Sequence, residues 1–216
     1  KSGNTWLRSL IANYYFSDSG EFNFELLEKI ESFPSNKYFR KYLDKFNQPH
    51  DTSKYWIKEQ EKINRSRGIK FFKTHNALCK IEGNQFTNKE NTLGVIYIIR
   101  DPRNVITSLS NHYQISVEEA FQFMTDEKRG IISKEKERFL GFQALFSWKL
   151  NQKSWVENKL YPILTVRYED LQNDPLNTFK QVINFINKIS KSEEKFNKEK
   201  ALKCICLLYT SDAADE

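Results

Sequence analysis

The chain has 216 residues, of which 39% are hydrophobic and 14% aromatic, so it is a globular domain and not a disordered polypeptide. Its net charge of +6 suits an anionic ligand, and a nucleic-acid surface would also carry it. No apolar run is long enough to span a membrane, no signal peptide is visible, and Cys79, Cys204 and Cys206 have neither disulfide nor metal-ligand spacing. These features favour a reducing compartment, and we expect a cytoplasmic protein without stable membrane insertion.

The chain opens on a short polar loop, Lys1 to Thr5, that leads into a helix. Apolar residues recur there at helical spacing: Trp6, Leu7, Leu10, Ile11 and Tyr14. A helix N-terminus offers unpaired N–H groups, Gly3 permits close approach of a ligand, and Lys1 adds a full charge. The loop therefore suits an anion such as phosphate, although it lacks the Walker A order. The alternative is an ordinary helix capped by Asn4 or Thr5.

Residues 17–68 are predicted to form mainly helices and loops. A short amphipathic helix is expected near residues 24–31, and Asp51 is expected to begin a second helix that reaches about Asn64. Aromatic residues are dense in this region, and we interpret most of them as core. Some of them are candidates for an acceptor pocket.

Two predicted strands each end in polar residues. Residues 69–73 form a short strand, with Thr74 and His75 on the loop that follows. Residues 93–99 are a continuous apolar run, typical of a central parallel strand, and Arg100 comes directly after it. A charge at the carboxyl edge of such a strand points to a carboxylate or phosphate partner, within reach of Ser108 on the next helix.

Asp101 and Pro102 are predicted to start that next helix, which runs to about Tyr113. Further helices are expected at residues 116–129, 136–159, 174–186 and 193–203, with a third strand at residues 161–168. We assign residues 1–203 to one incomplete domain and interpret residues 204–216 as a non-native tail, because its end is small and acidic. We expect a strand upstream of Lys1 and a basic segment downstream, and we expect the 216-residue chain alone to be inactive or nearly so.

Several motifs together resemble the sulfotransferase domain that uses 3′-phosphoadenosine-5′-phosphosulfate (PAPS). Lys1 to Trp6 (KSGNTW) is similar to that family's 5′-phosphosulfate loop, with Asn4 in place of the commoner Thr. Lys73-Thr74-His75 is similar to its K-T-H, and Arg100 to Arg103 with Ser108 is similar to its 3′-phosphate motif. Tyr168 to Leu171 (YEDL) is similar to its Y-E-D segment. The resemblance covers roughly residues 1–186, and the family's C-terminal basic segment is not found.

The resemblance implies an α/β fold, in which a three-layer parallel sheet flanked by helices is related to the P-loop kinases. It also implies sulfuryl transfer from PAPS, without a metal, to a hydroxyl or amine acceptor on a small molecule, glycan or lipid. His75 would be the general base, with Lys1 and Lys73 neutralising charge on the transferring group. The 5′-phosphosulfate would be bound by Lys1 and the N–H groups of Ser2, Gly3, Asn4 and Thr5. Trp6 and Tyr168 would contact adenine, and Arg100 and Ser108 would hold the 3′-phosphate.

Three other functions compete with this one. A P-loop nucleotide kinase would need the Walker A order and a magnesium-holding acidic residue. An RNA-binding module would need a basic stripe, but Lys and Asn are spread along the whole chain, so we expect no nucleic-acid partner. A nucleotide-binding fragment without turnover is the third. The acceptor and the oligomeric state are not fixed by the sequence.

Overall fold

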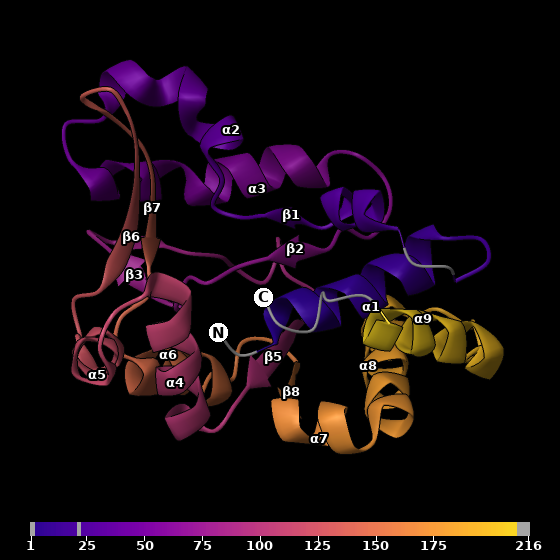
Figure 1. The fold of residues 1–216 in the computed structure, drawn as a ribbon. Coiled ribbons are helices and arrows are strands. Elements are labelled where there is room, and N and C mark those ends of the chain that lie inside the picture. The colour runs from indigo at the N-terminus through magenta and orange to yellow at the C-terminus, as the bar shows by residue number, and fades with distance from the viewer. Residues whose placement is uncertain (1–2, 21–22, 211–216) are drawn as a thin grey trace.

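The computed structural model describes residues 3–20 and 23–210 (Figure 1). Two pairs of parallel strands lie at its centre. β5 (Val95–Ile99) pairs with β8 (Ile163–Arg167), and β1 (Glu31–Ser32) pairs with β2 (Phe72–Lys73). The predicted α/β class is confirmed, and within the described residues the parallel strands form these two separate pairs.

Two antiparallel pairs complete the strands. β3 (Lys80–Ile81) pairs with β4 (Asn84–Gln85), and β6 (Gly130–Glu135) pairs with β7 (Arg138–Ala144). The β6–β7 hairpin rises along one side of the molecule toward α2 (Asn36–Phe39) (Figure 1).

The predicted helix at residues 136–159 is therefore wrong in its first half. Lys136 turns the chain with a φ of 53°, and only α6 (Trp148–Val156) is helical. Phe139 and Phe142 match a helical spacing, but in the hairpin they lie opposite Lys134 and Ile132. Contacts with distant segments favour the hairpin, because Phe139 and Phe142 pack against the aromatic cluster that contains Phe39 and Trp56, and tertiary contacts override local pattern.

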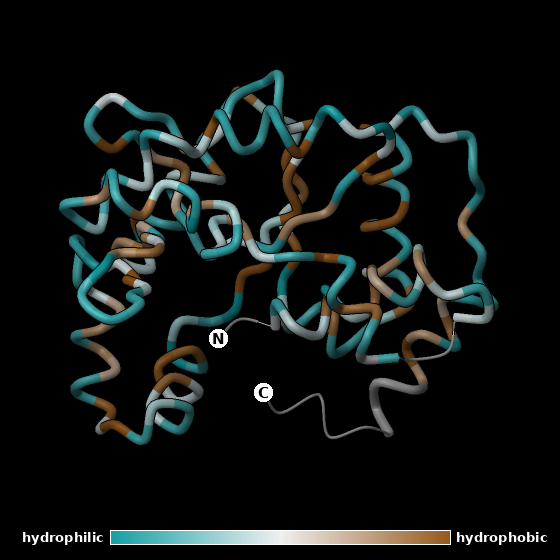
Figure 2. The backbone as a smooth tube through the Cα atoms, turned by 90° about the horizontal axis from the view of Figure 1, so that it is seen from above, coloured by the Kyte–Doolittle hydropathy of each residue, from teal (hydrophilic) through white to brown (hydrophobic). Residues whose placement is uncertain are grey.

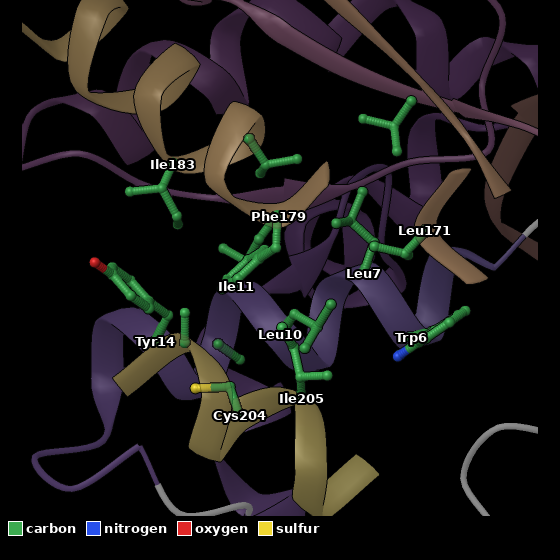
Figure 3. Close-up of a cluster of buried hydrophobic side chains, with 14 of the residues drawn as sticks. Trp6, Leu7, Leu10, Ile11, Tyr14, Leu171, Phe179, Ile183, Cys204 and Ile205 are labelled. Atoms are coloured by element: carbon green, nitrogen blue, oxygen red, sulfur yellow. The ribbon is translucent and has the colours of Figure 1, made fainter. Parts of the chain in front are cut away.

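The main core lies around α1 (Asn4–Phe16). Its apolar residues meet side chains from α7 (Tyr168–Asn173), α8 (Pro175–Ser190) and α9 (Lys198–Thr210) (Figure 3). Leu10 and Phe179 are fully buried within this cluster. Figure 3 shows Cys204 and Ile205 against α1, and both are buried. The last helix therefore contributes to the main core, and it starts and ends later in the chain than the predicted helix at residues 193–203.

η1 (Phe24–Lys29) packs against the main core through Leu26 and Leu27. A second, aromatic core is surrounded by short helical elements of the next segment, η2 (Arg40–Lys45), η3 (Pro49–Tyr55) and α3 (Trp56–Asn64). The predicted start at Asp51 falls inside η3, where the Asp51 carboxylate accepts the N–H groups of Asn47 and Gln48 at 2.8 Å. The interpretation of most aromatics as core is confirmed by the burial of Phe33, Phe39, Tyr42 and Phe46.

α4 (Pro102–Tyr113) and α5 (Val117–Thr125) pack together as a third apolar cluster. Their predicted starts are confirmed, because Asp101 caps α4 and Ser116 forms a capping box with Glu119. The outer loops are mostly hydrophilic when the molecule is viewed from above (Figure 2). Among the described residues, no helix is both long and apolar enough to cross a lipid bilayer.

Candidate active site

The backbone entering α1 is shaped by Gly3. Gly3 has a φ of 81° and precedes the helix as its N-cap, and its carbonyl accepts the N–H of Leu7 at 3.1 Å. A Cβ at this position would lie 2.4 Å from Cδ2 of Tyr168, so only glycine fits. The predicted capping by Asn4 or Thr5 is wrong, because both lie inside the helix and no side chain caps it.

This helix start has features that favour an anion. Within the described residues no side chain caps this helix, and its first turn contains no acidic residue. The Oδ1 atom of Asn4 is buried and has no hydrogen-bond partner within the described residues. Asn4 therefore holds an unsatisfied polar atom beside a site where a ligand could satisfy it.

Trp6, Arg100 and Tyr168 form a packed group, here called the Tyr168 stack. The Arg100 guanidinium lies over the Tyr168 ring, 4.2 Å from its centroid. The Trp6 ring meets Tyr168 edge-on, with centroids 5.7 Å apart. Both aromatic rings are only 8% exposed, so they belong mainly to the core and offer a ligand little more than an edge.

The loops after β5 and β8 are also joined by polar contacts. The Asp101 N–H donates to Oε1 of Glu169 at 2.9 Å. The Asp101 carboxylate accepts the N–H of Arg103, and its side-chain bond to Arg103 lowers the pKa of Asp101 to about 2. Arg100 is thus held at the carboxyl edge of the β5–β8 pair, as the sequence predicts.

A cavity of about 840 Å³ brings two other predicted groups together. Its walls include Asn4 and Thr5 from the start of α1, and Lys73 and His75 from the end of β2. No carboxylate contributes to the walls among the described residues. The cavity therefore has a cationic end suited to negative charge.

His75 has the properties of a neutral base in this cavity. Although part of its side chain reaches solvent, burial, together with a smaller contribution from the charge of Lys73, lowers its pKa to about 4. The imidazole is consequently unprotonated at neutral pH and able to accept a proton.

The remaining predicted residues are less closely tied to this site. Ser108 lies on α4, half-buried, and makes no hydrogen bond within the described residues, so its hydroxyl is available to a ligand. Lys1 and Ser2 lie outside the described residues.

Two asparagines of the site were not predicted from the sequence. Asn76 is 1% exposed, and its Oδ1 accepts the N–H of Ala144 at 2.7 Å. Asn151 of α6 donates from Nδ2 to the carbonyl of His75 at 3.2 Å. The position of Asn76 next to His75 could have drawn attention to it, but nothing local marks Asn151.

No group of three or more His, Cys, Asp and Glu side chains in the described part of the chain is arranged to hold a metal ion.

The comparisons with known proteins agree with the motifs. No curated protein matches the sequence. A family model described as a sulfotransferase domain matches residues 1–204, nearly the whole chain. The chain belongs to the sulfotransferase domain family.

Proposed function

We propose that this domain transfers a sulfuryl group from PAPS to a hydroxyl or amine acceptor, with His75 as the general base. The observation that carries the proposal is the shared cavity, because it places the start of α1 and the Lys73–His75 strand end around one space. Bound PAPS would supply the sulfuryl group. The acceptor would be a small molecule or the hydroxyl of a glycan or lipid.

The start of α1 fits the 5′-phosphosulfate. Gly3 keeps side-chain atoms away from the approach to the helix, and the N–H groups of the first turn would be donors for anionic oxygens. The buried Oδ1 of Asn4 cannot contact an anion favourably, so we assign it to a donor on the acceptor or to a bridging water. Lys1 would add charge at the same place.

Arg100 is the best candidate for the 3′-phosphate. Stacking on Tyr168 fixes the plane of the guanidinium, and a fixed guanidinium loses little entropy when it forms a two-pronged contact with phosphate. Ser108 would add a hydroxyl donor. Trp6 and Tyr168 would contact adenine through their remaining exposed edges.

His75 and Lys73 act on the acceptor side. The neutral imidazole takes the acceptor proton as the new bond forms, S–O for a hydroxyl or S–N for an amine, and the bond from sulfur to the donor's phosphate oxygen breaks. Lys73 neutralises negative charge that is spread over the transferring group. Transfer of this kind depends mainly on alignment and on charge stabilisation, which these residues supply.

The extent and location of the protein are part of the proposal. We propose residues 1–203 as the sulfotransferase domain, with a cytoplasmic location, because Cys79, Cys204 and Cys206 are all free. The interpretation of residues 204–216 as a non-native tail stays a prediction.

Substitution of His75 tests the chemistry. In the full-length protein, His75→Ala should lower the turnover of labelled PAPS roughly 10²–10⁴-fold, the usual range for a lost general base. Affinity for adenosine 3′,5′-bisphosphate should stay within about twofold, because His75 does not hold the nucleotide in this proposal. His50→Ala is the matched control, since His50 bonds Glu82 away from the cavity lining. Near-normal turnover by His75→Ala on every accepted substrate would show that the base lies elsewhere.

A further inference from the structure

The peptide that carries His75 has no regular secondary structure to hold it. Residues 74–77 lie between β2 and β3 and belong to neither strand. A general base must keep its position within a fraction of an ångström of the acceptor to be effective. Something outside the strand ladder must therefore fix this segment.

One side chain of α6 links that segment to two other elements. Nδ2 of Asn151 donates to the carbonyl of His75 at 3.2 Å and to the carbonyl of Leu145, just after β7, at 2.9 Å. Oδ1 of Asn151 accepts the Tyr97 hydroxyl of β5 at 3.2 Å. Burial raises the pKa of Tyr97 to about 12, so this hydroxyl stays protonated and can donate. Because two carbonyls require the amide nitrogen and a hydroxyl donates to the oxygen, the amide has one favourable orientation.

Other residues on the same face of α6 hold the rest of the segment. Trp155 Nε1 donates to the carbonyl of Asn76 at 2.9 Å, and the Ser154 hydroxyl accepts the N–H of Leu78 at 3.0 Å. Positions 151, 154 and 155 are neighbours on a helix surface, so one helix face binds the backbone at His75, Asn76 and Leu78, while Ala144 of β7 accepts the N–H of Ala77 at 2.7 Å. Among these three residues, Asn151 is the one that reaches His75 itself.

We propose that Asn151 is a positioning residue for His75, which it holds through the backbone carbonyl while Tyr97 orients its amide. This role rests on the proposed function of His75 as base. Asn151 does not touch the reacting atoms in this proposal, so its loss should affect chemistry and leave nucleotide binding unchanged.

The kinetic test uses the full-length protein. Asn151→Ala removes both donors to the carbonyls, and kcat should fall roughly 10–100-fold, the scale expected for an ångström of misplacement. Asn151→Asp keeps the size of the side chain but places a carboxylate against two carbonyl oxygens, and its kcat should fall by at least as much. Affinity for adenosine 3′,5′-bisphosphate, measured by calorimetry, should stay within about twofold in both variants. Asn158→Ala is the matched control, because in the described part of the chain the Asn158 side chain bonds only to Trp155 and Leu160 near the helix end, and its kcat should not change.

A second readout does not require turnover. The His75 imidazole, labelled with ¹⁵N, should titrate at a higher pH in Asn151→Ala than in the unaltered protein, because a released segment exposes the ring to water. Tyr97→Phe deletes only the hydroxyl that orients the amide, and it should shift kcat and the imidazole signals in the same direction by less. If Asn151→Ala does not fold, Tyr97→Phe still tests whether the oriented amide of Asn151 positions His75.

Two results would overturn the role of Asn151. One is unchanged kcat and unchanged His75 imidazole signals in the Asn151 variants. The other is a loss of bisphosphate affinity and melting temperature in proportion to kcat, which would mean general destabilisation. If the unaltered full-length protein transfers nothing from PAPS, the proposed function fails, while the imidazole titration still decides whether Asn151 holds His75.

Discussion

Gly3 offers a sharp test of how the helix start is built, because the structure provides a matched control for it. In Gly3→Ala, the new Cβ would lie 2.4 Å from Cδ2 of Tyr168 and 3.2 Å from Cδ1 of Ile98. The backbone at Gly3 also has a φ of 81°, which costs a residue with a Cβ about 1–2 kcal/mol. Gly83 has the same φ of 81°, but a Cβ there would meet nothing within 4 Å.

The two substitutions therefore differ mainly in the clash. Gly83→Ala should lower the free energy of unfolding by about 1–2 kcal/mol, from backbone strain alone. Gly3→Ala should lower it by about 2–5 kcal/mol, because overpacking against the Tyr168 ring adds about 1–3 kcal/mol. The excess of Gly3→Ala over Gly83→Ala measures the cost of displacing Tyr168, and with it Arg100.

Urea unfolding measures the free energy of unfolding of both variants. Calorimetry with adenosine 3′,5′-bisphosphate should show weaker binding in Gly3→Ala and unchanged binding in Gly83→Ala. Equal losses of unfolding free energy in the two variants, with equal nucleotide affinity, would refute the close packing of Gly3 on the Tyr168 stack.

Two further predictions concern the charged groups of the site. Arg100→Ala should lose about 1.5–3 kcal/mol of bisphosphate binding in calorimetry, the scale of a hydrogen bond to a charged group, while AMP binding changes little. Arg103→Ala is its control, since the Arg103 side chain is 87% exposed and pairs with Asp101, and equal losses in the two variants would argue against a 3′-phosphate site at Arg100. The acid limb of the kcat profile should lie near pH 4–5, because the pKa of His75 is lowered to about 4 and only the neutral ring accepts a proton. A limb near the ordinary pKa of about 6.5 would mean that the ring is fully hydrated in the working enzyme.

The sequence by itself determined the features that depend on neighbouring residues. Asp101 and Pro102 predicted the start of α4, and Ser116 predicted the start of α5, because a cap bonds to a backbone N–H two or three positions along the chain. The apolar run before Arg100 predicted the strand β5 and its parallel pairing in an α/β fold. The same local motifs, in order, identified the family.

Only the tertiary structure decided the features that depend on residues far apart in the chain. The spacing of Phe139 and Phe142 is typical of a helix, and the hairpin forms because both rings pack against an aromatic cluster from distant segments. The Tyr168 stack joins three elements, so no local pattern could place Arg100 on that ring. Asn151 lies 76 residues from the His75 carbonyl that it holds, and a lone asparagine in a helix carries no local sign of such a bond.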